Sequence, residues 1–157
     1  MIEKEELLSI VPHRGRMLLL SRVKGYNVKE RSLEAEFDIT EDCLFYDSAA
    51  AGVPAWVGIE FIAQAIAALA GLRGREKGEE PQLGFILSIS SVETELSFFR
   101  AGSTVEIKVK EKGYMDAVHS FEGRIFLEGR KVLEGSLTVM DADNEQIQAL
   151  KKEHKIT

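Results

Sequence analysis

The chain has 157 residues, 26 of them acidic and 20 basic, with a formal net charge of -6 at pH 7. This length fits one domain, expected to span 1–157, and it allows roughly 70% of the unfolded chain's surface to be buried on folding. The acidic balance argues against a nucleic-acid surface, which needs a basic patch. A single cysteine, Cys43, excludes an internal disulfide, and the first residues lack the pattern of a secretory signal, so we expect a cytoplasmic protein.

The N-terminal part predicts a short helix and two strands. The helix is expected over 3–10, and the strands over 17–28 and 31–39. In the second strand apolar side chains alternate with charged ones, a period of two that is typical of a half-buried antiparallel strand. The apolar side chains of that alternation are Leu33, Ala35, Phe37 and Ile39.

The central segment, 54–73, consists of small and apolar residues except for Glu60, Gln64 and the closing arginine. A helix that is apolar on every side is a buried helix, and residues four apart lie on one face of it. Burial disfavours the charged form of a carboxyl, which makes Glu60 a candidate general acid, against the alternative of a structural carboxyl that hydrogen-bonds to Gln64 and holds the helix to the sheet. The segment reaches the lower limit of length for a membrane span, but its many Ala and Gly residues and Glu60 favour a core helix, so no membrane span is expected.

The C-terminal half predicts a charged connector over 73–82, four strands and a polar tail that frays from residue 141, with a short helix at 144–152. Glu128-Gly129-Arg130 carries the glycine that a tight hairpin turn needs. A lone apolar helix among amphipathic strands is best buried by a sheet that curls around it. The fold class expected is therefore α+β, with an antiparallel sheet wrapped around one long buried helix. The expected strands cover 84–96, 104–112, 117–127 and 131–140.

This order of elements resembles the hotdog fold. Val11-Pro12-His13-Arg14, followed by Met17-Leu18-Leu19-Leu20, resembles the opening of the β-hydroxyacyl-ACP dehydratases of fatty-acid biosynthesis. Pro54-Ala55-Trp56-Val57-Gly58-Ile59-Glu60 with Ala63-Gln64 resembles the start of their central helix. The longer match over 52–68 is similar to the dehydratase-like proteins of aryl polyene biosynthesis.

The resemblance implies a reaction and a pair of catalytic groups. In the family a histidine removes the Cα proton of a 3-hydroxyacyl thioester, and an acidic residue on the partner's helix helps the hydroxyl to leave, with no cofactor. Glu60 matches the acidic residue. When the family's motif is aligned on Glu60 without gaps, the position of its catalytic histidine corresponds to Tyr46. The segment 45–52 contains no histidine. Asp47 is then the candidate base, against the alternative of a turn-former beside Ser48.

The resemblance also implies which residues contact the substrate. His13 is expected either to line the site or to fix the N-terminal segment, and Trp56 to pack near the helix start and wall an acyl tunnel. Backbone N–H groups over 51–57 are expected to bind the thioester oxygen. No two histidines have the spacing of metal ligands, so no metal is expected. The substrate-binding set is His13, Tyr46, Gly52, Val53, Pro54, Trp56 and Gln64.

Three functions remain open on the sequence. The first is a dehydratase that converts 3-hydroxyacyl chains on acyl carrier protein, or the corresponding CoA thioesters, to trans-2-enoyl thioesters. The second is a non-catalytic pseudo-dehydratase subunit that pairs with an active homologue, and the third is a hotdog acyl thioesterase. A homodimer or a heterodimer with a related dehydratase is expected, because a hotdog sheet has an unpaired edge strand. Arg73, Arg75, Lys77 and Arg100 are interpreted either as a basic rim for acyl carrier protein or, as is more common, as solvated charge of the connecting segments.

Overall fold

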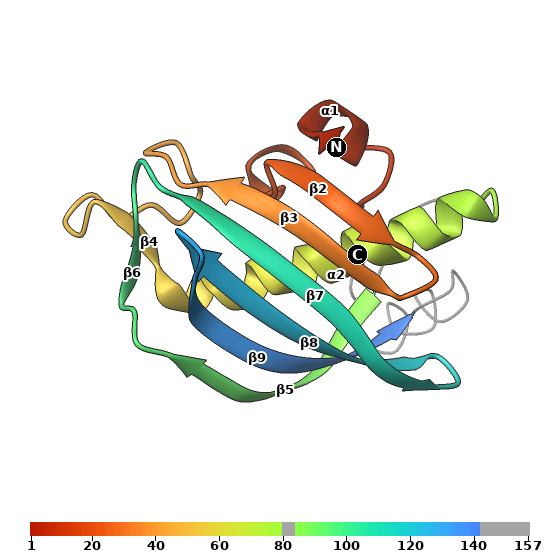
Figure 1. Cartoon of the computed structure of the whole chain (residues 1–157). Helices are drawn as coiled ribbons and strands as arrows, with labels where there is room; N and C mark the ends of the chain where they lie inside the picture. Colours follow the sequence, from red (N-terminus) through yellow and green to blue (C-terminus); the bar gives the residue numbers. More distant parts are fainter. Residues whose placement is uncertain (80–83, 142–157) are drawn as a thin grey trace, which may run out of the picture.

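The computed structural model describes residues 1–79 and 84–141. Within these residues, seven strands form one antiparallel sheet in the order β1-β2-β3-β7-β8-β9-β5, and β4 pairs with β6 in a small second sheet. The long helix α2 runs along one face of the curved large sheet (Figure 1). The helical elements are α1 Lys4–Leu7, η1 Gly15–Met17, η2 Ala55–Val57 and α2 Gly58–Glu76. The strands are β1 Ile2–Glu3, β2 Arg22–Asn27, β3 Ser32–Asp38, β4 Gly52–Pro54, β5 Gly84–Thr94, β6 Phe98–Arg100, β7 Thr104–Met115, β8 Val118–Leu127 and β9 Arg130–Asp141.

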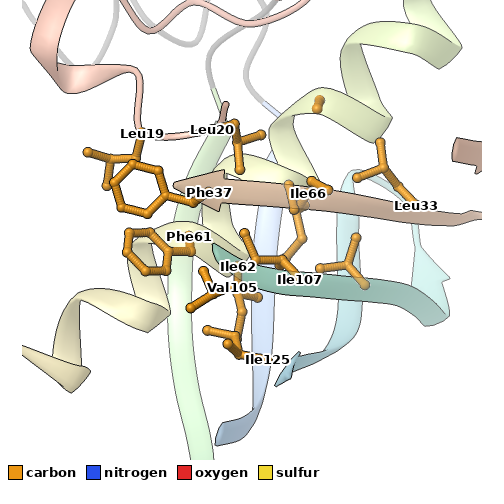
Figure 2. Packing of buried hydrophobic residues seen from close by; sticks show 14 of the residues in the cluster. Leu19, Leu20, Leu33, Phe37, Phe61, Ile62, Ile66, Val105, Ile107 and Ile125 are labelled. Atoms are coloured by element: carbon orange, nitrogen blue, oxygen red, sulfur yellow. The ribbon is translucent and has the colours of Figure 1, made fainter. Parts of the chain in front are cut away.

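The core lies between α2 and the concave face of the sheet. The prediction for 31–39 is confirmed, since the four apolar side chains of the alternation are at most 5% exposed. They meet side chains from the buried side of α2, and Phe37 and Phe61 approach with ring centroids 4.5 Å apart. Figure 2 shows this packing, with Phe61, Ile62 and Ile66 of α2 next to residues of β3, β7 and β8. The prediction of an antiparallel sheet around one long helix is therefore confirmed.

Several predicted boundaries differ from the structure. The strand expected over 17–28 begins only at Arg22, because the preceding residues form η1 and the Leu19 N–H donates to the Gln64 side chain rather than to a neighbouring strand. The N-terminal helix starts at Lys4 because Glu3 pairs with β2, and it ends at Leu7, after which the chain continues in hydrogen-bonded turns to Ile10. The helix expected over 54–73 starts at Gly58, after a 3-10 turn, and continues to Glu76.

Two short strands, β4 and β6, were not predicted, because three residues are too few to show a period of two. The hairpin predicted at Glu128-Gly129 is confirmed, and both residues have positive φ, 50° and 80°. The predictions for the tail from residue 142 onward lie outside the described residues.

By length and composition, Ala55–Glu76 is apolar enough to cross a membrane, with a mean hydropathy of 1.7. This value belongs to the most apolar stretch of the segment, and 61% of that stretch is buried inside the protein. The helix therefore has the burial of a core helix, which agrees with the prediction from its Ala and Gly content.

Candidate active site

One face of α2 is not covered by the sheet and lines a groove of about 420 Å³. The groove also takes residues from the N-terminal segment and from β5, β8 and β9, among them His13, Phe85 and His119. The prediction that α2 is buried on every side is therefore wrong for this face. Small residues at a spacing of three or four follow Glu60 along this face, with Ile66, Gly71 and Arg73 beside them: Ala63, Ala67, Ala70 and Gly74.

Glu60 stands on the groove face in the first turn of α2. Its side chain is 37% exposed, so the full burial that the sequence suggested is not observed in the single chain. The Gln64 amide, one turn further along, donates from Nε2 to Glu60 Oε1 over 3.1 Å. This hydrogen bond fixes the position of one carboxyl oxygen of Glu60.

Gln64 is fully buried, and both atoms of its amide have partners. Its Oε1 accepts the Leu19 N–H over 2.8 Å, and its Nε2 donates to the Met17 carbonyl over 2.7 Å. These two bonds settle the orientation of the amide, because Leu19 can only donate and the carbonyl can only accept. Gln64 does not line the groove. It is therefore reassigned from substrate contact to holding Glu60 and the N-terminal segment in place.

His13 reaches the same end of the groove from the N-terminal segment. Its Nε2 lies 3.9 Å from Glu60 Oε1, and its side chain is 25% exposed. The Arg14 guanidinium braces the turn, because its Nη1 donates to the carbonyls of Val11 and His13 over 2.7 Å each. Burial lowers the pKa of His13 below its ordinary 6.5, an effect that nearby Glu60 opposes and Arg14 assists. The imidazole is therefore mainly neutral at pH 7.

A close backbone approach delivers His13 to this position. A Cβ on Gly71 of α2 would lie 2.8 Å from the carbonyl carbon of Ile10 and closer still to its oxygen. The absence of a side chain at Gly71 thus lets the segment that precedes His13 pack directly on the helix. The interpretation of His13 as lining the site agrees with this arrangement.

Asp47 lies elsewhere, in a turn. Its Oδ1 accepts the N–H groups of Ala49 and Ala50 over 2.9 and 3.3 Å, and its backbone exchanges hydrogen bonds with Gly52. Neither Asp47 nor Tyr46 lines the groove beside Glu60. The geometry matches the turn-former that the sequence left as the alternative, so Asp47 has no part in the Glu60 site of the same chain.

The other residues expected to bind substrate belong to the second sheet and the start of the helix. Gly52 is required there, because a Cβ would lie 3.1 Å from the Phe99 carbonyl carbon across the β4–β6 pair. Val53 is 1% exposed and Trp56 is 66% exposed, with its ring 5.6 Å from that of Phe45. Trp56 therefore does not wall a tunnel in the single chain. None of Gly52, Val53, Pro54 and Trp56 lines the Glu60 groove.

A buried ionic cluster at the other end of the groove was not predicted. Glu111, whose side chain is 1% exposed, forms a short contact with His119 and lies 3.1 Å from Arg31 Nη1 and 3.7 Å from Arg73 Nη1. His119, which falls in the strand expected over 117–127, is 8% exposed and lines the groove. A signal was present: the alternation Val105, Ile107, Val109 continues to Glu111, which places this carboxyl on the inner face.

Within the part of the chain that the structure describes, two of the four residues of the predicted basic rim form ion pairs. Arg75 pairs with Glu6 over 2.9 Å and Arg73 belongs to the Glu111 cluster, whereas Lys77 lines the groove. Among the residues that the structure describes, no group of three or more His, Cys, Asp or Glu side chains could hold a metal ion. The chemistry available at Glu60 is therefore that of a carboxyl group beside a neutral imidazole, at the end of a mainly apolar groove.

Comparison with known proteins adds independent information. The model of the ApeP-like family, described as ApeP dehydratase, matches residues 5–152. A 3-hydroxyacyl-[acyl-carrier-protein] dehydratase FabZ from Erythrobacter litoralis is 29% identical over 146 residues, which cover 88% of this chain and 92% of that protein. A FabZ from Chlamydia caviae is 35% identical over 74 residues, 45% of this chain and 48% of that protein.

Solved structures agree with the fold. A chain of the dehydratase heterocomplex ApeI:P from Xenorhabdus doucetiae superposes with a TM-score of 0.82 at 26% identity, over 92% of this chain and 95% of that chain. A hypothetical thioesterase with coenzyme A from Streptococcus pneumoniae gives a TM-score of 0.59 at 11% identity, over 77% of this chain and 84% of that chain. The second likeness is one of fold alone, the hotdog fold.

Proposed function

Because the chain belongs to the ApeP-like dehydratase family, we propose that it provides the acid half of a dehydratase site for 3-hydroxyacyl chains carried on acyl carrier protein. Glu60 donates a proton to the 3-hydroxyl group, which leaves as water. A base takes the Cα proton, and the electron pair of the C–H bond forms the Cα=Cβ double bond of the trans-2-enoyl product.

The position of Glu60 is the observation that carries this proposal. The carboxyl opens onto a groove whose α2 side is formed mostly by small residues, so an acyl chain can lie along the helix with its reacting carbons at Glu60. Gln64 holds the carboxyl by one oxygen. An acid fixed in this way on a rigid helix meets the requirement for positioned proton transfer.

We assign the base to a histidine of a related hotdog subunit. This chain has no histidine over 45–52, and Asp47 is engaged in its own turn. Within residues 1–79 and 84–141, the edge strand β5 is paired on one side only, with β9, and it exposes apolar side chains that a second chain would cover. The exposed set is Ile86, Leu87, Ile89 and Val92, each 43–52% exposed. The likeness to a chain of a dehydratase heterocomplex supports a related dehydratase as the occupant rather than a second copy.

We also propose an aryl polyene pathway as the setting, on the sequence resemblance over 52–68, and the cytoplasm as the compartment. A carrier-protein substrate fits a groove that opens beside Lys77, because the recognition surface of acyl carrier protein is acidic. A thioesterase is not proposed, since the thioesterase cited above is 11% identical and indicates the fold only.

The test measures enoyl product from 3-hydroxyacyl-ACP with this chain alone, with a histidine-bearing hotdog dehydratase alone, and with both. We expect turnover from the mixture, and Glu60→Gln should lower it by about 10²- to 10⁴-fold, the usual contribution of a positioned acid. Glu76→Gln is the matched control, because Glu76 is an exposed carboxylate at the end of the same helix.

Each other outcome has a clear meaning. Full activity of this chain alone would refute the assignment of the base to a partner. Undiminished turnover by the Glu60→Gln mixture would refute the role of Glu60. Release of free acid and thiol in place of enoyl product would identify a thioesterase.

A further inference from the structure

We infer that His13 is a neutral imidazole with its proton on Nε2, and that this N–H donates a hydrogen bond to the 3-hydroxyl oxygen of the substrate, the same oxygen that Glu60 protonates. The inference rests on the proposed function, because it assigns His13 to one atom of that substrate. His13 is thus a specificity residue for the 3-hydroxyl group and not a replacement for the missing base.

The surroundings of the two ring nitrogens decide the tautomer. His13 Nδ1 is buried and has no hydrogen-bond partner among the described residues. A proton on Nδ1 would leave an unpaired donor in the interior, which is more costly and rarer than an unpaired acceptor. Nε2 lies at the groove, 3.9 Å from Glu60 Oε1, where a bound ligand or solvent can accept its proton in a hydrogen bond. The buried Nδ1 without a partner therefore decides the tautomer and favours the proton on Nε2.

The charged imidazolium is disfavoured by the same arrangement, because it would carry a proton on both nitrogens. Burial is the dominant influence on the His13 pKa and lowers it. Of the charged groups that face the ring, Glu60 on α2 opposes this effect and Arg14 in the same turn assists it. His13 thus stays a neutral donor across the physiological range.

The distance between the two side chains fits a shared ligand atom. At 3.9 Å, Nε2 and Oε1 are too far apart to bond each other directly. A substrate oxygen that lies about 2.9 Å from Nε2 and about 2.9 Å from Oε1 is within hydrogen-bonding distance of both atoms. A 3-hydroxyl placed there accepts from His13 while Glu60 transfers its proton to the same oxygen. The departing water then accepts a hydrogen bond from the neutral His13 N–H and donates one to the Glu60 carboxylate that remains.

A base at His13 would need the opposite tautomer. Its lone pair would have to be on Nε2, which places the proton on the buried Nδ1. The two roles thus differ in an observable property of the free protein, the location of one proton.

The first experiment is ¹⁵N NMR of histidine-labelled protein between pH 6.5 and 8. His13 is assigned by the signal lost in His13→Gln. We expect a protonated Nε2 and an unprotonated Nδ1 throughout. A proton on Nδ1, or an imidazolium at pH 7, would overturn the inference. This measurement needs neither activity nor a partner.

The second experiment compares binding of two unreactive amide analogues of the thioester, a 3-hydroxyacyl-pantetheine and the same acyl chain without the hydroxyl. We expect about a tenfold preference for the hydroxyl, the value of one hydrogen bond. His13→Leu removes the donor and should abolish the preference. His13→Gln supplies an amide N–H but no titrating base, and should keep most of it.

The outcomes separate this inference from the proposed function. If Leu and Gln variants bind both analogues as wild type does, the role of His13 is refuted whatever the turnover. Loss of turnover in His13→Gln, with a pH–rate limb assigned to His13, would identify it as the base and also refute the inference. If no mixture turns over 3-hydroxyacyl-ACP while the preference and the tautomer are as expected, the proposed function fails and the inference stands. Should His13→Leu fail to fold, the NMR result on the wild-type chain decides.

Discussion

Gly71→Ala tests whether the close approach between α2 and the N-terminal segment is as tight as the structure indicates. The new Cβ would lie 2.8 Å from the Ile10 carbonyl carbon and 2.9 Å from its Cγ2, both well inside ordinary contact distance. The nearest atoms are backbone, so a rotamer change of Ile10 cannot relieve the contact. The segment that carries His13 must instead move away from the helix.

The magnitude follows from two opposing effects. Forcing an additional carbon into a packed contact costs about 1–3 kcal/mol, and a backbone obstacle points to the upper end. Replacing Gly by Ala inside a helix returns about 1 kcal/mol. We therefore expect a net loss of about 2 kcal/mol in the free energy of unfolding, which for a chain of this length lowers the unfolding temperature by about 4–8 °C.

The assay is thermal and urea unfolding followed by circular dichroism at one fixed protein concentration. Gly74→Ala is the matched control on the same helix, because the nearest atoms to its Cβ would be 3.7 Å away, which is ordinary contact. It should gain up to about 1 kcal/mol from helix propensity. If Gly71→Ala proves as stable as Gly74→Ala, the reasoning about the Ile10 contact is refuted.

Two further predictions concern charged groups. Hydrogen bonds from Arg22 lower the pKa of Asp38, so this carboxylate stabilises the fold above its ordinary pKa of 3.8 and stops doing so as the pH falls through the lower folded value. Asp38→Asn should cost about 0.5 kcal/mol at pH 7, since the side chain is 40% exposed and screened, and the difference should vanish in acid titrations of stability once the pH falls below the lowered folded pKa of Asp38. Glu111→Ala removes the anion from a buried cluster that includes His119 and should cost about 3 kcal/mol in urea unfolding. The same change at exposed Glu6 should stay within about 0.5 kcal/mol, and equal effects at Glu111 and Glu6 would contradict the burial argument.

The sequence determined the elements whose side chains follow a regular period. The alternation over 31–39 predicted which side of β3 is buried, and the apolar run after Pro54 predicted the central helix. Glu60 was identified because a carboxyl group within an apolar helix is unusual, and this can be recognised from the local sequence without knowing which residues contact it. Such patterns can be read locally, because the direction of each side chain depends on the backbone of its own element.

Boundaries and short elements were less predictable. The strand β2 starts later than predicted because the Leu19 N–H donates to the side chain of Gln64. These two residues are 45 positions apart in the sequence. The strands β4 and β6 exist because they pair with each other, not because either has a pattern of its own. Interactions between distant parts of the chain thus override the local preference.

Asp47 shows how a motif position can mislead. Its place next to the expected histidine made it a candidate base, while its side chain closes a local turn through the Ala49 and Ala50 N–H groups. Residue type and position do not reveal which hydrogen bonds a carboxylate makes, because turns and catalytic sites use the same donors and acceptors.

The sequence by itself thus determined the fold class, the central helix and its one notable carboxyl. Only the tertiary structure decided that α2 has an open face, that His13 stands across from Glu60, and that Glu111 meets His119 behind the same groove. The physical reason is that periodicity fixes the direction of a side chain within its element. The distance between side chains of different elements depends instead on strand register and on close backbone contacts such as that of Gly71 with Ile10.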